Sequence, residues 1–220
     1  MANKIEKVKE VREESLVTNS IFITETNSTK IMTIIKLLKK NSAGGIDNIS
    51  VKVLKHLSSF LALPLSILIN NIINTGICPK HFKKAEIIHI HKAGSKKDML
   101  NYRPISLISN IAKIFENIIH QRICRYLQKY ELLNSNQYGF RKNLSTSDAL
   151  ANFSNTIYNN LDSIKPTLAI FLDLAKAFDT VNHKLLIKKL FNLGIRGQTL
   201  KLFENYLQDR SQVVKINSNK

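Results

Sequence analysis

The chain has 220 residues, of which 44% are hydrophobic and 22% charged, enough for one compact domain or two small lobes. These values exclude a disordered tail or a fibrous repeat as the main description of the chain. Lysine and arginine number 33 against 16 aspartate and glutamate, and the net charge of +17 favours a polyanionic partner: nucleic acid first, an anionic membrane surface second.

Neither the cysteines nor the apolar segments indicate secretion or membrane insertion. Cys78 and Cys124 are far apart in apolar helical segments, so they form no disulfide framework and no zinc-binding spacing. The N-terminus mixes charges and lacks the apolar run of a signal peptide. The longest apolar stretch, Phe60 to Ile69, is shorter than the ~20 residues that cross a bilayer. We expect an intracellular protein, in the nucleus or cytoplasm, with no membrane partner.

The first third of the chain predicts a lead-in followed by helices. Residues 1–30 are charged and then rich in Thr, Asn and Ser, which predicts a loosely attached segment. A helix is expected from Ser28, and residues 41–45 break it. A second helix is expected over Ser50–Leu61, and Pro64 is expected to open a third that ends at Gly76.

The next segment predicts a β-hairpin. From Ala85 to Lys92, isoleucines at 88 and 90 alternate with His89 and His91, which is the pattern of a strand. Residues 93–95 turn the chain, and Tyr102–Ile105 is expected to pair back. The two histidines share one face of the strand, but a metal site is disfavoured because no third ligand is nearby.

The rest of the chain predicts helices around one buried strand. An apolar stripe between Leu107 and Leu127 indicates a long helix. Ser145 is an expected N-cap for a helix with four inward residues. These residues are Leu150, Phe153, Ile157 and Leu161. The continuous apolar run 167–172 predicts a buried strand. Helices over 185–193 and 199–207 and a strand over 212–216 complete an α+β fold.

Asp173 directly follows the predicted buried strand. A carboxylate there is costly to desolvate unless a cation, a helix N-terminus or a metal faces it. The alternative is that Asp173 only caps the following turn. Asp179, six residues on, would lie roughly 20 Å away in an extended segment, too far to share a metal pair, and is read as a turn or cap residue.

Four sequence blocks, in order, resemble the reverse transcriptases of non-LTR (LINE-type) retrotransposons. Residues 171–181, FLDLAKAFDTV, resemble the first aspartate motif of the palm. Residues 101–107, NYRPISL, resemble the fingers motif. Residues 137–141, QYGFR, with Ser145-Thr146 resemble the block between fingers and palm. Residues 42–47, SAGGID, resemble a segment upstream of the fingers.

This resemblance implies roles for individual residues. Asp173 matches the palm aspartate that binds catalytic magnesium ions, and Leu174 would offer a backbone carbonyl beside the same metal. Phe178 matches the aromatic residue that packs under the incoming sugar; its alternative is an ordinary core aromatic. Arg103 matches the arginine that grips the triphosphate, and Lys92 is similar to the fingers lysine. The alternative for both is a solvated basic hairpin.

The block between fingers and palm is open to two interpretations. Tyr138, Phe140 and Arg141 can contact the template strand by stacking and phosphate pairing. Alternatively, the aromatic residues fill a buried turn at the junction of fingers and palm.

The resemblance predicts reverse-transcriptase-like fingers (residues 42–165) after a lead-in and helix (1–41), then a partial palm (166–220). This is an incomplete right-hand polymerase fold, mostly helical with a short antiparallel sheet. The family is an RNA-directed DNA polymerase that uses an RNA template, a DNA primer, deoxynucleoside triphosphates and Mg²⁺. The family's downstream Asp-Asp hairpin is not matched, since no two aspartates are adjacent in the 220 residues, and we expect the chain to be inactive alone. The alternative is a non-enzymatic basic RNA- or DNA-binding module.

Overall fold

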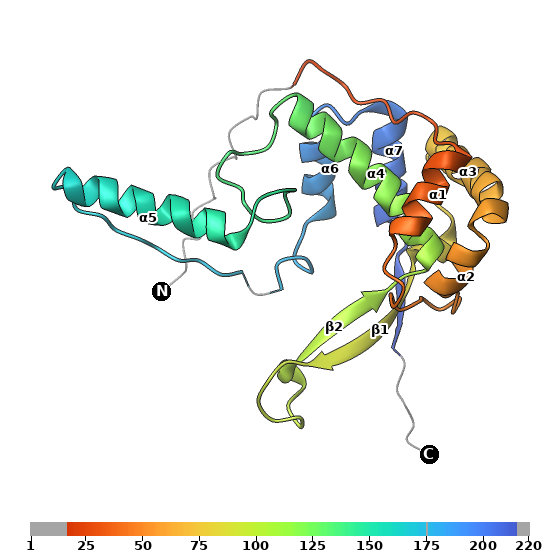
Figure 1. Cartoon of the computed structure of the whole chain (residues 1–220), viewed down its shortest axis with the longest axis horizontal. Coiled ribbons are helices and arrows are strands. Elements are labelled where there is room, and N and C mark those ends of the chain that lie inside the picture. Colours follow the sequence, from red (N-terminus) through yellow and green to blue (C-terminus); the bar gives the residue numbers. More distant parts are fainter. Residues whose placement is uncertain (1–16, 175, 215–220) are drawn as a thin grey trace, which may run out of the picture. The chain divides into compact units, whose positions relative to one another are not determined.

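The computed structural model describes residues 17–174 and 176–214, which fall into two compact units (Figure 1). Unit 1 holds the residues up to Ile123 and those from His183 onward, and unit 2 holds Cys124–Asn182. Helix α4 (Asn110–Lys129) begins in unit 1 and ends in unit 2. The expected assignment of residues 42–165 to fingers and 166–220 to palm stays a prediction.

Helices build the core of unit 1. They are α1 (Ser28–Leu37), α2 (Val51–His56), α3 (Ser58–Thr75), α7 (Gly197–Leu207) and the first part of α4. Helix α6 (His183–Asn192) also belongs to unit 1 but has no buried residue. Ile31, Ile34 and Ile35 of α1 are buried in a core cluster that they share with α3, and Asn27 caps α1 by accepting the Lys30 N–H at 2.9 Å. The apolar stripe of α4 is likewise buried from Ala112 to Ile119. Leu107, predicted to start that helix, belongs to a strand instead.

Pro64 does not open a helix. The break lies earlier, at Leu57, and Pro64 is inside α3. A proline there removes one intrahelical hydrogen bond. Six residues of α3 are buried, and their packing offsets this loss. Gly76 ends α3 as expected, with a left-handed φ of 67°.

The sheet has three strands in the order β2-β1-β3. Strands β1 (Lys84–His91) and β2 (Tyr102–Leu107) form the expected antiparallel hairpin. Strand β3 (Ser211–Val214) pairs with the other edge of β1 in parallel, so the sheet is mixed and the prediction of an antiparallel sheet was wrong. The reason is the connection: β3 reaches β1 after α6 and α7, and no short hairpin joins them.

The described part of the predicted lead-in is firmly attached to unit 1. Ile21 forms a parallel bridge with Ile195, and its N–H donates to the Gly194 carbonyl at 3.0 Å. Further along, the Asn70 side chain exchanges two hydrogen bonds with the backbone of Thr26, at 2.7 and 2.9 Å. Loose attachment is therefore wrong for residues 17–27. Residues 1–16 lie outside the described residues.

Unit 2 contains α5 (Thr146–Asp162) and a long irregular segment. Ser145 is the N-cap of α5 as expected, and together with Asp148 it forms a capping box. The predicted buried strand over 167–172 is not present: the segment belongs to no sheet, and four of its residues are 73% to 89% exposed. These are Leu168, Ile170, Phe171 and Leu172. The inward residues predicted for α5 are exposed or half-buried as well.

The physical reason is the lack of a partner. A strand needs a neighbour for its backbone hydrogen bonds, and none of the described residues pairs with 167–172. The segment instead contacts α5 through edge-to-face packing of the Phe153 and Phe171 rings, with centroids 5.7 Å apart, and through a hydrogen bond from Asn160 to Thr167.

One described helix, α3, is long and apolar enough by length and composition to cross a bilayer. A third of its residues are buried inside unit 1, and core helices of soluble proteins have the same length and composition.

Candidate nucleotide and nucleic-acid site

The hairpin places Lys92 and Arg103 on one face. Arg103 lies opposite Ile90 in the β1–β2 register, and paired residues point to the same side of a sheet. Lys92 is two residues beyond Ile90, and its N–H continues the ladder by donating to the Asn101 carbonyl at 2.8 Å. Both cationic residues are exposed. Their face therefore offers a guanidinium and an ammonium to one bound anion.

The other face of the hairpin holds the two histidines. The His91 and Tyr102 rings pack edge to face with centroids 5.3 Å apart, and His91 Nε2 is 3.1 Å from the Gly94 carbonyl oxygen. Among the described residues, no group of three or more His, Cys, Asp or Glu side chains comes together as a metal site. His91 has a structural role in the hairpin turn.

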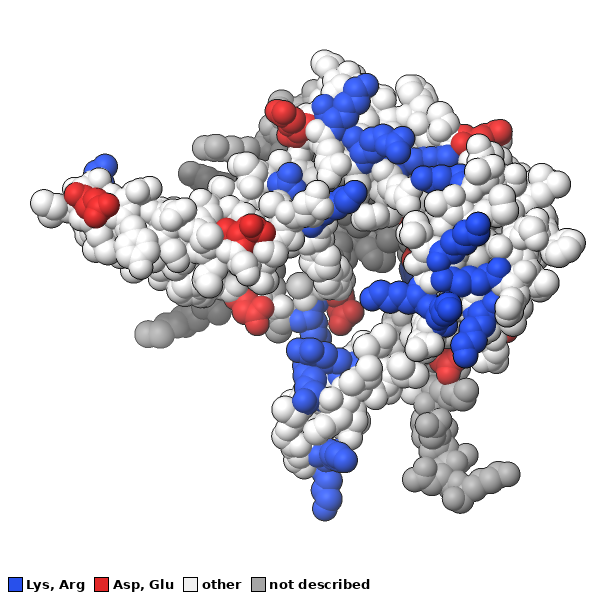
Figure 2. Space-filling view, viewed as in Figure 1, with Lys and Arg blue, Asp and Glu red and all other residues white. Residues whose placement is uncertain are grey.

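The surroundings of the hairpin are basic. Lys96 and Lys97 are exposed in its turn, and Asp98 uses its carboxylate to accept the Leu100 N–H at 2.9 Å. Figure 2 shows far more Lys and Arg than Asp and Glu on the visible face, with basic side chains reaching the end of the hairpin. Such a distribution attracts nucleotides and nucleic-acid backbones.

The upstream block 42–47 is packed onto the start of α4. Lys113 Nζ donates to Ser42 Oγ, the Ala43 carbonyl and Asn110 Oδ1 at 2.7–3.0 Å. The Asp47 carboxylate accepts a hydrogen bond of 2.5 Å from the Ser109 hydroxyl. The block therefore fixes the position of the chain where strand β2 leads into helix α4.

Gly45 makes this packing possible. A Cβ at residue 45 would lie 2.5 Å from the Ser109 nitrogen and 2.6 Å from the Ile108 carbonyl carbon, both backbone atoms. Only a glycine allows the two chains to approach so closely. Ser109, Asn110 and Lys113 were not predictable from the sequence, because their partners are 61 to 71 residues away and no local pattern marks them.

Asp173 and Leu174 lie in the irregular segment of unit 2, and both are exposed. The carboxylate has no hydrogen bond or ion pair to any described residue. After it, residues 176–180 form a turn in which the N–H groups of Asp179 and Thr180 donate to the Lys176 carbonyl at 2.9 and 3.2 Å. Asp179 is thus a turn residue, as expected.

Two of the recognised blocks meet in unit 2. The rings of Phe140 and Phe178 pack edge to face, with centroids 5.8 Å apart and planes at 90°. Both remain largely exposed, at 90% and 79%. Phe178 is therefore no core aromatic in this structure, and its ring is available to a ligand together with that of Phe140.

Arg141 shapes the turn before α5. Its Nη1 donates to the carbonyls of Asn134 and Gln137 at 3.1 and 3.4 Å, and Gln137 Nε2 donates to the Gly139 carbonyl at 3.2 Å. Phe140 is held in a left-handed conformation with φ of 60° and faces solvent. Tyr138 is half-buried.

The residues of the candidate site are divided between the units. Lys92 and Arg103 belong to unit 1, and Asp173, Phe178 and the 137–141 block belong to unit 2. Their convergence on one cleft stays a prediction. Two-metal phosphoryl transfer needs several carboxylates around the ions. Among the described residues, Asp173 belongs to no cluster of carboxylates that could hold two metal ions, so these residues do not form a two-metal site by themselves.

Cys78 has no features of a nucleophile. Its side chain is buried, and burial raises the pKa of the thiol to about 11 despite the charges of Lys83 and Arg210. Neither Cys78 nor Cys124 forms a disulfide within the part of the chain that the structure describes.

Comparison with known proteins identifies the class. The sequence profile described as "Reverse transcriptase (RNA-dependent DNA polymerase)" matches residues 90–220. A "Probable RNA-directed DNA polymerase from transposon BS" of Drosophila melanogaster is 34% identical over 191 residues, 85% of this chain and 21% of that protein. The "Probable RNA-directed DNA polymerase from transposon X-element" is 30% identical, covering 89% and 22%, and the polymerase "from mobile element jockey" 28%, covering 87% and 21%, both from the same species.

The chain belongs to the reverse transcriptase (RNA-dependent DNA polymerase) family. The resemblance to the enzymes of non-LTR retrotransposons is confirmed. The chain spans about a fifth of the length of these relatives. Reverse transcriptases are metal-dependent polymerases that use a nucleic-acid template and nucleotide substrates.

Proposed function

We propose that the chain forms the fingers and the first part of the palm of the RNA-directed DNA polymerase of a non-LTR retrotransposon. The observation that carries this proposal is the shared face of Lys92 and Arg103 on the hairpin of a chain that belongs to the reverse transcriptase family. A guanidinium and an ammonium on one face match the negative charge and the oxygen acceptors of a nucleoside triphosphate.

Each remaining site residue has a role in this proposal. Phe178, with its exposed ring, packs under the sugar of the incoming deoxynucleotide. Asp173 and the Leu174 carbonyl would hold Mg²⁺, which neutralises phosphate charge when bound. The exposed and unpaired carboxylate is free to take a cation, while the further ligands are not among the described residues.

The template side of the proposal rests on the 137–141 block. Phe140 exposes a ring on which a base can stack, and Tyr138 is partly accessible beside it. Arg141 Nη1 donates to the turn carbonyls of Asn134 and Gln137, and we assign it the role of positioning Phe140. We also assign the Arg141 guanidinium a contact with an RNA phosphate. The partners are an RNA template, a DNA primer and deoxynucleoside triphosphates.

The second candidate function is a non-enzymatic RNA- or DNA-binding module. Two observations favour it: Asp173 lies on an unpaired, exposed segment, and the net charge of +17 suffices for non-specific binding to nucleic acid. Both candidates predict binding to primer–template that weakens steeply with salt. Only the polymerase predicts a triphosphate site at the hairpin.

Triphosphate binding at the hairpin separates the two. We expect Arg103→Ala to weaken binding of a fluorescent deoxynucleoside triphosphate about 10- to 100-fold in the 220-residue chain, since a hydrogen-bonded charge pair is lost. Lys92→Ala is expected to have a smaller effect in the same direction. Lys52→Ala, which removes one exposed charge from α2, is the control and should change affinity little.

Primer extension on an RNA template with Mg²⁺ completes the test. We expect none from these 220 residues alone. If Arg103→Ala and Lys52→Ala weaken triphosphate binding equally, the hairpin is no triphosphate site and the binding module is the better description. Extension that Asp173→Ala abolishes would overturn the expectation that the chain is inactive alone.

A further inference from the structure

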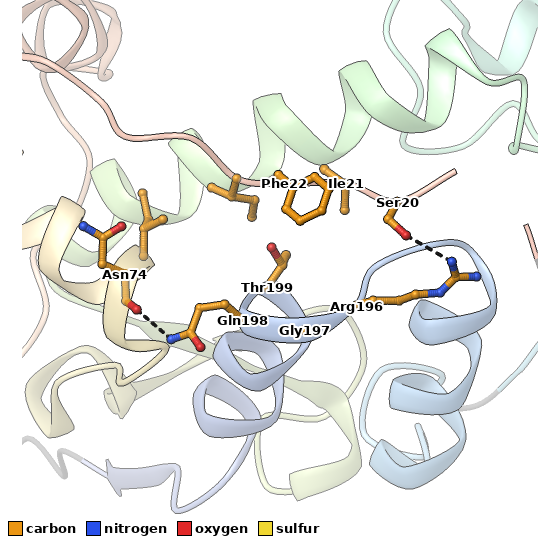
Figure 3. A pocket seen from close by; sticks show the side chains of 10 residues that line it. Ser20, Ile21, Phe22, Asn74, Arg196, Gly197, Gln198 and Thr199 are labelled. Atoms are coloured by element: carbon orange, nitrogen blue, oxygen red, sulfur yellow. Dashed lines mark hydrogen bonds between the residues drawn. The ribbon is translucent and has the colours of Figure 1, made fainter. Parts of the chain in front are cut away.

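Unit 1 contains a cavity of about 450 Å³ that the proposed polymerase roles do not use. It lies between the N-terminal segment, the end of α3 and the start of α7 (Figure 3). Its volume is in the range of small-ligand pockets. All of its lining residues belong to unit 1, so its geometry is independent of unit 2.

Hydrogen bonds fix the walls of this cavity. Arg196 donates to Ser20 Oγ at 3.0 Å and to the Val17 carbonyl, which holds the N-terminal segment against the start of α7. Gln198 Nε2 donates to the Asn74 carbonyl at 2.8 Å and ties α7 to the end of α3. A pocket with fixed walls loses little entropy when a ligand binds.

The start of α7 attracts an anion. Its N-cap, Arg196, makes no side-chain cap, and the first turn contains no acidic residue. The N–H groups of residues 197–199 therefore have no acceptor within the helix and form the positive end of its dipole. Gly197 adds access: a Cβ built there would meet no atom within 4 Å.

Thr199 is the second, independent observation. Its side chain is only 7% exposed, yet its hydroxyl has no hydrogen-bond partner among the described residues. Figure 3 shows this side chain pointing from α7 into the cavity, toward Ile21 and Phe22. The hydroxyl oxygen itself is not among the fully enclosed unpartnered atoms of the described residues, so it is open to the cavity, where a ligand or water can complete its hydrogen bonding.

Phe22 supplies an aromatic surface on the opposite wall. Its ring lines the cavity and is 84% exposed, although its neighbours Ile21 and Ile23 are buried or half-buried. Exposed aromatic rings beside phosphate donors are the elements with which proteins bind single-stranded nucleic acid. A base can stack on Phe22 while its phosphate meets the start of α7.

We propose that this cavity binds one phosphorylated nucleoside, with the phosphate at the N-terminus of α7 and the Thr199 hydroxyl and the base on Phe22. The ligand is either one residue of a single strand or a free nucleoside monophosphate. None of the residues lining the cavity belongs to the hairpin or to the segment that contains Asp173. The site extends the proposed function by a nucleic-acid contact in unit 1, and it does not depend on the triphosphate site.

The test uses the whole 220-residue chain and two pairs of variants. Thr199→Val removes the hydroxyl and Thr199→Ser keeps it. Phe22→Leu removes the exposed ring in the cavity, and Phe60→Leu removes a comparably exposed ring (78%) on α3 outside it. Circular dichroism and thermal unfolding confirm that each variant folds. The probes are a fluorescent oligouridylate, an oligothymidylate and uridine monophosphate.

We expect Thr199→Val and Phe22→Leu each to weaken binding about tenfold, and Thr199→Ser and Phe60→Leu to bind as the unmodified chain does. Loss with the oligonucleotides alone identifies a strand segment, and loss with uridine monophosphate as well identifies a free nucleotide. Oligonucleotide and monophosphate binding unchanged in both Thr199→Val and Phe22→Leu would overturn the proposal. If Thr199→Val fails to fold, Phe22→Leu decides alone, because its side chain is largely exposed.

Triphosphate binding measured in parallel separates this proposal from the previous one. The cavity variants should leave the affinity for the triphosphate unchanged. Phe22→Leu should weaken oligonucleotide binding by the same factor whether or not Arg103→Ala is also present. Failure of the hairpin test therefore leaves the cavity test intact. If Phe22→Leu weakened triphosphate binding tenfold, the cavity would not be a separate site and the inference would be wrong.

Discussion

Helix α1 in unit 1 and helix α5 in unit 2 share the same amphipathic pattern but differ in burial. In unit 1, Ile31, Ile34 and Ile35 of α1 are at most 2% exposed. In unit 2, α5 has equally regular apolar residues and a capping box, yet it buries none of its residues. Periodicity determines which face of a helix is apolar, and burial requires a second surface that matches it.

The difference concerns packing partners and not local structure. In unit 1, α1, α2, α3 and the first part of α4 bury apolar residues in one core, and α7 completes it through the ring contact of Tyr206 with Phe115, whose centroids are 6.2 Å apart. In unit 2, α5 contacts the irregular segment 165–174 through Phe171 and Thr167, and this segment is itself exposed. Local interactions are therefore enough to form helix α5. The predicted strand over 167–172 does not form, because no described residue pairs with it.

The largest expected effect comes from a pair of side-chain substitutions to alanine, one in each unit. Ile69→Ala, at a fully buried site in α3, should lower the free energy of unfolding by about 2–5 kcal/mol, through lost burial and a cavity. Ile170→Ala, at a site 73% exposed, should change it by less than about 0.5 kcal/mol. Urea unfolding followed by circular dichroism measures both. Equal losses would mean that residues 167–172 are buried in solution, as the sequence predicts.

Helices and the hairpin were predictable from sequence because their signals are local. The N-cap at Ser145, the stripe of α4 and the alternation at 88–91 all appear where expected. The exposed segment 167–172 was not predictable, because an apolar run of six residues fits a buried strand whenever a partner exists. Pro64 was misplaced since a proline at a first turn and one inside a helix look alike in sequence.

The candidate site was predictable only through its motifs. Lys92 and Arg103 share a face because of strand register, which follows from the hairpin itself. The contact between Phe140 and Phe178 joins residues 38 positions apart, and no local rule indicates it. The cavity at α7 is less predictable still, because Phe22 and Thr199 are brought together by tertiary packing.

The second test examines how closely unit 1 is packed. Gly45→Ala places a methyl group 2.5 Å from a backbone nitrogen and should destabilise unit 1 by about 1–3 kcal/mol. Gly44→Ala is the matched control, because its Cβ would be 3.4 Å from the nearest atom, an ordinary contact. Denaturant unfolding of both variants measures the difference. A neutral Gly45→Ala would show that the 42–47 block can move away from α4.

The third test concerns a partly buried polar contact in unit 1. The Tyr206 hydroxyl donates to the Glu116 carboxylate. Burial raises the pKa of Glu116 above its ordinary value near 4.5, while this hydrogen bond and the charges of Arg210 and Lys113 oppose the rise. The folded state therefore binds this proton more tightly than the unfolded state does. Its contribution to stability is complete below the unfolded pKa and is lost as pH rises through the folded pKa.

Glu116→Gln removes this titration. Across the pH range just above 4.5, the difference in unfolding free energy between the unmodified chain and Glu116→Gln should shift against the unmodified chain by at most about 1.4 kcal/mol per pH unit. Tyr206→Phe, which removes the hydrogen bond that lowers the pKa, should extend this loss to higher pH. Parallel pH profiles of Glu116→Gln and the unmodified chain would contradict the assignment.

The smallest test compares the same capping interaction in the two units. Asn27 caps α1 and Ser145 caps α5, each by accepting a backbone N–H three residues on, at 2.9 and 3.3 Å. Removing either side chain costs about 1 kcal/mol of helix stability.

In unit 1 this loss should lower the midpoint of global unfolding, because α1 is part of the common core. In unit 2, Ser145→Ala should speed hydrogen exchange of α5 amides and leave that midpoint unchanged, because α5 buries nothing that unit 1 depends on. Amide exchange read by NMR or mass spectrometry, beside a thermal unfolding curve, measures both effects. A lower global midpoint in Ser145→Ala would show that the two units unfold together, and the contrast between them would then be one of exposure alone.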